Sequence, residues 1–172
     1  MRVLGIDPGT AVLGYGVVET GQSRQPRLLE CGALTTKARD PLPARLLVIH
    51  DGTGALLARH RPDAMAVESS FYGKNVRTTV VLSHARGVIL LAAEQAGVPV
   101  TEYSPALVKK TIVGRGGALK PQVGYMVAQL LRLKSAPEPA DAADGVAVAL
   151  THLIIATRQA AFFRQVTGGG AR

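Results

Sequence analysis

Two carboxylates in this sequence stand at the ends of apolar segments, where a structural role explains them poorly. Asp7 follows the apolar run Arg2 to Ile6, and Glu68 ends the apolar run that begins after Asp63. An isolated carboxylate buried at such a position would cost several kcal/mol. A turn cap or an exposed strand end would explain either acid alone. If the two strands are neighbours, the acids converge at the edge of a sheet where ligands commonly bind.

A second pair of acids, Asp141 and Asp144, lies three residues apart near the start of an expected helix. This spacing places both carboxylates on one face. An aspartate in the first turn of a helix is favoured by the helix dipole, so either residue alone has an ordinary explanation. As a pair they repel each other, and the helix start relieves this only in part.

Together the four acids predict a catalytic metal site. Clustered carboxylates need cations or must hold protons at neutral pH. Oxygen ligands without a His or Cys cluster select Mg²⁺, with Mn²⁺ as an alternative. Two such ions, roughly 3.5–4 Å apart, activate a water and stabilise the leaving oxygen of a phosphoryl group. The predicted catalytic and metal-binding residues are Asp7, Glu68, Asp141 and Asp144.

The charge of the chain points to an anionic partner. The formal net charge is +8, and six of the Lys and Arg residues lie in the acid-free segment Ser104 to Ser135. A second acid-free run extends from Ser69 to Ala93. Basic runs beside an acidic metal site suit a phosphate backbone, although each could also be a solvated face. The candidate DNA-contacting cations are Lys74, Arg77, Lys109, Lys110, Arg115 and Lys120.

Two aromatic residues, Phe71 and Tyr72, follow Glu68 on a polar segment that contains Gly73. Paired rings beside a catalytic site could unstack or wedge a base. They could equally anchor the segment onto the core.

Composition excludes several other classes. The single cysteine, Cys31, permits neither an intrachain disulfide nor a thiolate zinc site. We expect no signal peptide, and the uninterrupted apolar stretches are shorter than the ~20 residues of a membrane span. A cytoplasmic protein without a membrane partner is therefore expected.

The pattern of turns and apolar residues predicts one α/β domain over residues 1–160 and a flexible tail over 161–172. Short connections between the first three strands imply an antiparallel meander. The expected strands are Arg2 to Ile6, Val12 to Glu19, Arg27 to Thr36, Ala64 to Glu68 and Val98 to Tyr103. The expected helices are Pro41 to Arg61, Lys74 to Ala96, Pro105 to Val113, Pro121 to Leu133 and Ala140 to Gln159.

The helix over Lys74 to Ala96 carries apolar residues on more than one face. Such a helix is usually covered on two sides. A sheet would cover one side, and either a second subunit or more of the same chain would cover the other.

These motifs resemble the RuvC family of crossover junction endodeoxyribonucleases in the RNase H-like superfamily. The resemblance is carried in order along residues 1–160 by Gly5 to Thr10, by Ala66 to Glu68 with Phe71 and Lys74-Asn75, by Val108 to Lys120, and by Asp141 to Gly145. It implies an RNase H-like fold: a five-stranded mixed sheet, three strands antiparallel and then two parallel, flanked by helices.

The same resemblance implies a homodimer that resolves four-way (Holliday) DNA junctions in recombination and repair. The expected reaction is two-metal-ion hydrolysis, in which paired symmetric nicks leave 5′-phosphate and 3′-hydroxyl ends. The resemblance matches the four acids to metal ligands, Phe71 to an aromatic that enters the junction, and Lys109 and Lys120 to cations near the cut. It also implies cooperation with the RuvA–RuvB branch-migration complex.

Three alternatives remain open from the sequence. A RuvX-like RNase of the same superfamily would act on structured RNA. A sugar-kinase-like ATPase would share the Asp7-Pro8-Gly9-Thr10 loop but needs a longer chain. A non-catalytic DNA-binding module would explain the charge but not the four acids.

Overall fold

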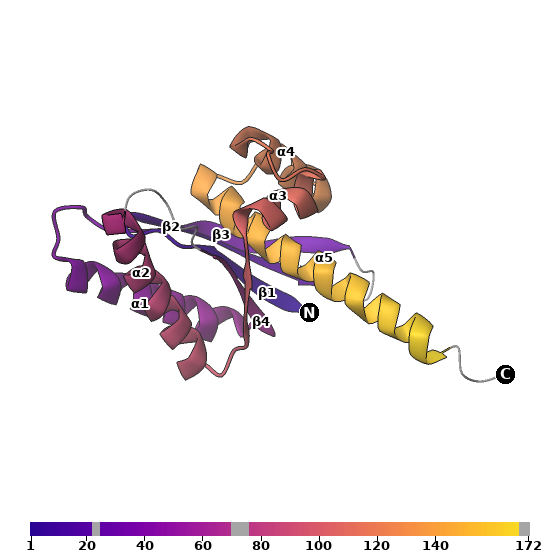
Figure 1. Ribbon diagram of the computed structural model, residues 1–172, viewed down its shortest axis with the longest axis horizontal. Coiled ribbons are helices and arrows are strands. Elements are labelled where there is room, and N and C mark those ends of the chain that lie inside the picture. Colours follow the sequence, from indigo (N-terminus) through magenta and orange to yellow (C-terminus); the bar gives the residue numbers. More distant parts are fainter. Residues whose placement is uncertain (22–24, 70–75, 169–172) are drawn as a thin grey trace.

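A computed structural model describes residues 1–21, 25–69 and 76–168 of the chain. Its centre is a five-stranded sheet in the order β3-β2-β1-β4-β5 (Figure 1). The strands are β1 (Arg2–Asp7), β2 (Val12–Thr20), β3 (Pro26–Thr35), β4 (Ala64–Glu68) and β5 (Val100–Tyr103). β1 pairs antiparallel with β2, and β2 with β3, whereas β1–β4 and β4–β5 are parallel. The predicted mixed sheet is confirmed.

Five helices flank this sheet: α1 (Leu42–His60), α2 (Val76–Gln95), α3 (Pro105–Val113), α4 (Lys120–Leu131) and α5 (Ala140–Gly168). All five were expected, but α5 runs to Gly168 instead of ending at Gln159. Helical backbone therefore continues into the segment predicted as a tail, because nothing before Gly168 breaks the helix. The domain boundary near residue 160 stays a prediction.

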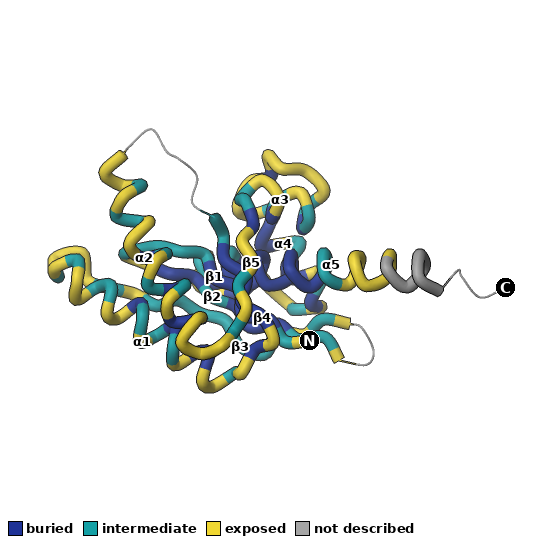
Figure 2. The backbone as a smooth tube through the Cα atoms, turned by 60° about the horizontal axis from the view of Figure 1, so that its bottom comes forward, coloured by how far each residue is buried: buried dark blue, intermediate teal, exposed yellow. Residues whose placement is uncertain are grey.

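The two faces of the sheet carry separate cores. On one face, β1 and β2 side chains such as Leu4 and Val17 pack with Ile49 of α1 and Ile89 of α2. On the other face, Val3 packs with α3, α4 and α5. Figure 2 shows the buried tube of α5 lying along the sheet, while much of α2 is exposed. Because strand side chains alternate between faces, Asp7, four residues after Val3, points to the α5 side.

Among the residues that the structure describes, two helices are long and apolar enough to cross a membrane by length and composition alone, Val76–Gln95 and Ala140–Phe162. The second is 61% buried inside the protein, as expected for a core helix packed on a sheet. The first is only 22% buried. Mean hydropathy over a whole helix thus selects two candidate spans, whereas the length of uninterrupted apolar stretches predicted none. The apolar surface of α2 is therefore largely exposed in the single chain.

Candidate active site

The ends of two adjacent strands bring the first two acids together. β1 and β4 run parallel with Gly5 opposite Ala66 and Ile6 opposite Val67, so Asp7 and Glu68 follow at the same sheet edge. Strand alternation directs both side chains to the α5 face. The Ser69 backbone N–H donates to the Tyr103 carbonyl at 2.8 Å, which holds the chain immediately after Glu68 against β5.

The first turns of α5 supply the third acid. Asp144 shares one small pocket of about 120 Å³ with Asp7 and Glu68. Val108 of α3, Val123 of α4 and Ala147 of α5 form its apolar wall. Three helices thus enclose the sheet edge and exclude water from one side of the carboxylates.

Two lysines complete the pocket, Lys109 from α3 and Lys120 from the start of α4. The Lys120 ammonium donates to Asp144 Oδ2 at 2.6 Å. This hydrogen bond raises the pKa of Lys120, so the lysine stays charged. α3 is fixed by its N-cap, where Leu107 N–H donates to Ser104 Oγ at 3.3 Å, and it ends at Gly114 with φ of 90°.

The electrostatics of the pocket favour a bound cation. Burial, with repulsion from Asp144 second, raises the pKa of Asp7 to about 6. Burial, with repulsion from Asp7 second, raises the pKa of Glu68 to about 7, although Lys109 and Lys120 oppose this shift. Raised pKa values of this kind mean that the surroundings of the carboxylates hold too little positive charge to balance them.

Glycines explain how α5 comes close enough to deliver its acids. Gly14 pairs with Asp7 across β1 and β2, and a Cβ at Gly14 would lie 1.9 Å from the Asp141 carbonyl oxygen. A Cβ at Gly5 would lie 2.3 Å from backbone atoms of Gly145 and Ala149. The α5 backbone therefore rests directly on the strands, and Gly14 positions the first turn of α5 beside Asp7. Sequence reasoning missed this role; the Gly-rich β2 segment was its only signal.

A buried hydrogen bond fixes α5 from its other side. The Tyr103 hydroxyl and His152 Nδ1 are 3.0 Å apart, and both residues are at least nine-tenths buried. Tyr103 is opposite Glu68 in the β4–β5 ladder, so this bond joins α5 to the strand beside the acids. Burial lowers the pKa of His152, which keeps the imidazole neutral. The sequence showed His152 only as one of four scattered histidines.

The remaining predicted site residues do not line the pocket or lie outside the described residues. Asp141 does not line it, although its charge contributes to the raised pKa of Asp7. Lys110 on α3, Arg115 after α3 and Arg77 on α2 are exposed and also lie outside the pocket lining. The predicted contacts Phe71, Tyr72 and Lys74 lie outside the described residues.

The donor set fits a hard divalent cation, because the pocket offers carboxylate oxygens and no Cys or His. Within the described ranges, no group of three His, Cys, Asp or Glu side chains lies close enough together to hold a metal ion as placed. To share an ion, the carboxylates would have to draw closer together.

Comparisons with known proteins match this architecture to one family. The family described as crossover junction endodeoxyribonuclease RuvC matches residues 3–152. A protein of that name from Chloroflexus aurantiacus is 51% identical over 152 residues, which cover 88% of this chain and 92% of that protein.

Solved structures agree. The Thermus thermophilus RuvC structure superposes with a TM-score of 0.84 at 40% identity and covers 92% of this chain and 97% of the other. T. thermophilus RuvC in complex with a Holliday junction substrate superposes with a TM-score of 0.83 at 38% identity, covering 92% and 96%.

The first prediction concerns Gly14. Gly14→Ala should displace the first turn of α5, because the new Cβ would collide with the Asp141 backbone. We expect Mg²⁺ affinity to fall by about 10- to 100-fold, as when support behind a metal ligand is lost. Isothermal titration calorimetry of the protein with Mg²⁺ measures this affinity. In Gly52→Ala the Cβ meets only the flexible Leu34 side chain on the opposite face of the sheet, so its Mg²⁺ affinity should be unchanged. Equal Mg²⁺ affinities for the two variants would contradict the positioning role.

The second prediction concerns pH. Between the ordinary carboxyl pKa near 4 and the raised values of about 6 and 7, the folded protein binds more protons at Asp7 and Glu68 than the unfolded chain. The contribution of these two groups to stability therefore falls as pH rises from 5 to 8. Metal-free thermal unfolding of the wild type and of the double variant Asp7→Asn/Glu68→Gln isolates this contribution, because His152, which acts in the opposite direction, is present in both. The melting temperature of the double variant should rise relative to that of the wild type as pH increases. If the difference in melting temperature between the two proteins is the same at pH 5 and pH 8, the pKa values of Asp7 and Glu68 are not raised.

Proposed function

The chain belongs to the RuvC family of crossover junction endodeoxyribonucleases, and we propose that its pocket at the edge of β1 and β4 cuts the junction strand. The observation that carries this proposal is the convergence of Asp7, Glu68 and Asp144 with Lys109 and Lys120 in one pocket. Family membership favours a junction nuclease over the RNA-processing and non-catalytic alternatives, and the fold is the RNase H-like one that the sequence predicted.

Asp7, Glu68, Asp141 and Asp144 would hold two Mg²⁺ ions, or Mn²⁺ in their place. When bound, such ions lower the pKa of the attacking water and stabilise the leaving oxygen. Asp141 would reach the site from the same turn of α5 that carries Asp144. Hydrolysis that breaks the bond to the 3′ oxygen leaves a 5′-phosphate and a 3′-hydroxyl.

The lysines of the pocket would orient the phosphate. Lys120 is two-thirds exposed although its ammonium bonds Asp144, so it can reach both the acid and an incoming phosphate oxygen. Lys109 lines the same pocket from α3. Two cations flanking the carboxylates would let the phosphate enter a pocket that otherwise repels it.

The outlying basic residues would bind the junction arms. Lys110 and Arg115 are exposed on the α3 side of the pocket, and Arg77 is exposed on the first turn of α2. Phe71, Tyr72 and Lys74 belong to the segment that joins the catalytic edge to α2, and we propose that its rings enter the opened junction core. The junction itself is the substrate named for the T. thermophilus relative.

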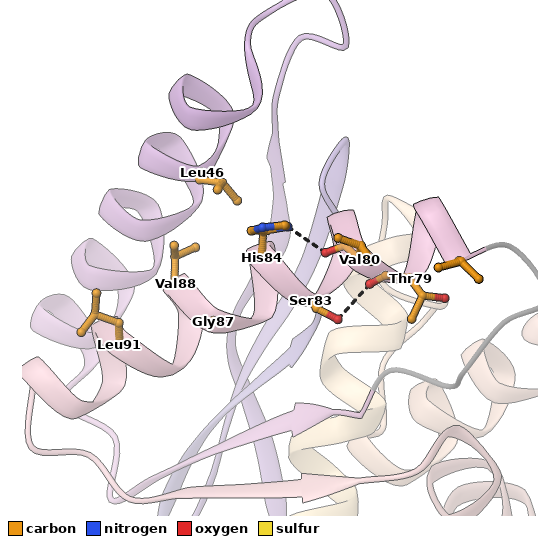
Figure 3. Close-up of a pocket in the computed structure, with 9 residues that line it drawn as sticks. Leu46, Thr79, Val80, Ser83, His84, Gly87, Val88 and Leu91 are labelled. Carbon is orange, nitrogen blue, oxygen red and sulfur yellow. Dashed lines mark hydrogen bonds between the residues drawn. The ribbon is translucent and has the colours of Figure 1, made fainter.

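A homodimer would supply two such pockets. An apolar groove of about 640 Å³ runs between α1 and α2, with Leu46, Val80, Val88 and Leu91 along it (Figure 3). Val80 and Leu91 are 48% and 51% exposed and both line this groove, and an exposed apolar patch of this kind marks an interaction site. A second copy that covers this groove would pair two nuclease sites and so allow symmetric nicks.

The cellular setting follows from the same proposal. Cooperation with the RuvA–RuvB complex would deliver migrating junctions, and substrates of this kind place the protein in the bacterial cytoplasm without a membrane partner. We propose that the nuclease domain spans residues 1–160.

The third prediction tests catalysis. Asp7→Asn should reduce Mg²⁺-dependent nicking of a synthetic four-way junction by at least about 100-fold, because a ligand oxygen and its charge are lost. Junction binding without metal should be unchanged or tighter, since a charge that repels phosphate is removed.

Gel assays of nicking and of mobility shift on the same junction measure both effects, with linear duplex as the substrate control. Asp51→Asn, on the exposed surface of α1, is the matched control and should nick normally. Normal nicking by Asp7→Asn would rule out the proposed mechanism.

The fourth prediction tests assembly. Val80→Asp should convert the dimer to a monomer, because a carboxylate would be buried in an apolar interface. Leu47→Asp is the matched control, because Leu47 is 60% exposed on α1 and does not line the groove. Sedimentation equilibrium gives the mass of each variant. If Val80→Asp is still a dimer, the dimer interface lies elsewhere. If the wild type is a monomer, the proposed dimer does not form.

A further inference from the structure

An ion pair joins α2 to the strand that lies beside Glu68. Arg86 Nε donates to Glu102 Oε2 at 3.1 Å, and a second guanidinium nitrogen of Arg86 donates to Glu102 Oε1. Such a two-point contact fixes direction as well as distance, because the guanidinium and the carboxylate are both planar. Glu102 is opposite Val67 in the β4–β5 ladder, and the next pair along is Tyr103 and Glu68. The ion pair therefore ties α2 to the edge of the sheet at the level of the acids.

The half of α2 that precedes this ion pair buries none of its residues. Residues 76–84 are all exposed or only partly buried, and the first buried residue of the helix is Ala85, next to Arg86. Figure 2 shows this leading half as a largely exposed tube. From Ala85 onwards, α2 packs into the core with side chains such as Ile89. The angle at which the leading half leaves the body of the protein is therefore set near Ala85, where Arg86 contacts Glu102.

This leading half carries much of the proposed dimer interface. Val76, Val80 and His84 line the groove between α1 and α2, whereas Arg86 does not. Val76 begins α2 ten residues before Arg86, about 15 Å away along the helix axis. A tilt of about 10° near Arg86 would thus move that end of the helix by about 2–3 Å. Because a two-fold interface uses the same surface on both copies, such a tilt changes the separation of the two pockets.

Paired nicks depend on that separation. Each pocket has to place its carboxylates against one phosphate of the same junction, and a misplacement of about 1 Å can slow a reaction by about 100-fold. With a wrong separation, one pocket can still engage its strand while the other cannot. A single nick is therefore less sensitive to the angle of α2 than a pair of nicks.

We propose that Arg86 and Glu102 are a positioning pair, which holds α2 at the angle that lets both pockets cut during one binding event. The inference rests on the proposed function, because it needs two nuclease sites in a dimer formed through α2. Neither residue lines the catalytic pocket, so neither is a catalytic residue. Their side chains are 32% and 37% exposed, and ion pairs of this kind contribute little to the stability of a fold. Removing the contact should therefore leave the fold intact and change mainly the orientation of α2.

The test uses a supercoiled plasmid that extrudes a four-way junction from an inverted repeat. The first nick releases the supercoiling that sustains the junction, so a linear product forms only if both nicks fall within one binding event. Separate nicks leave a nicked circle. Gel electrophoresis gives the ratio of linear to nicked product for wild type, Glu102→Gln, Arg86→Lys and the exchanged pair Arg86→Glu/Glu102→Arg. Glu94→Gln, exposed on the last turn of α2, is the matched control.

Wild type and Glu94→Gln should give mainly linear product. Glu102→Gln and Arg86→Lys should lower the ratio of linear to nicked product by at least about fivefold, a part of the loss that a misplacement of about 1 Å can cause. Lysine keeps the charge of Arg86 but lacks its planar fork. The rate of the first nick and the mass of the dimer should stay close to those of wild type. The exchanged pair should restore the ratio, because it rebuilds the contact in reverse.

Several results would overturn the positioning role. If both single variants keep the wild-type ratio, α2 holds its angle without the contact, and the nuclease function stands. If Glu102→Gln binds the junction more tightly, Arg86 is a phosphate contact that Glu102 restrains. If the first nick slows as much as the second, or the exchanged pair recovers nothing, the pair supports the protein only in general, and circular dichroism then shows whether the fold is affected. If wild type makes only nicked circles, the proposed symmetric nicks fail, and the positioning role with them.

Discussion

The backbone of α5 lies directly against β1 and β2, and the position of the proposed active site depends on that contact. Side chains at Gly5, Gly14 or Gly145 would place atoms within 2.5 Å of backbone across the interface. A helix packed through ordinary side chains would stand several ångströms higher, and Asp144 would then not reach the pocket of Asp7 and Glu68. Close-packed interiors transmit such shifts because they have little free volume. The hydrogen bond between Tyr103 and His152 fixes the same helix from its far side.

The close packing of α5 buries carboxylates that repel one another. Burial and mutual repulsion raise the pKa values of Asp7 and Glu68, so ionising them costs folding free energy. Lys120 relieves part of that cost through Asp144. The fold therefore holds a cluster of charges that is unfavourable by itself, and the apolar contacts of the two cores offset it. A divalent cation would turn the same repulsion into binding energy.

The sequence predicted the elements that rest on local signals. Turn residues separated the strands, and the apolar runs that end in Asp7 and Glu68 predicted two strand ends that would converge if the strands were neighbours; the parallel β1–β4 register shows that they are. Properties that depend on tertiary distance could not be predicted. The sequence does not show that Asp144 lines the pocket while Asp141 does not, because a spacing of three residues places both on one helix face and says nothing of their distances from the strand ends. The extension of α5 to Gly168 was missed because a Gly-rich end resembles a frayed tail.

The proposed nuclease site and the proposed dimer interface lie on opposite faces of the sheet. The pocket of Asp7, Glu68 and Asp144 lies on the side of α3, α4 and α5, whereas the exposed groove lies between α1 and α2 on the other side. A second copy on the groove would therefore leave the pocket open to DNA. The chain passes from Glu68 on the catalytic side to Val76, the first residue of α2, in eight residues. In the sequence, Phe71 and Tyr72 lie between β4, which ends at Glu68, and α2, the proposed dimer helix. Assembly would thus set the separation of the two aromatic segments as well as that of the two pockets.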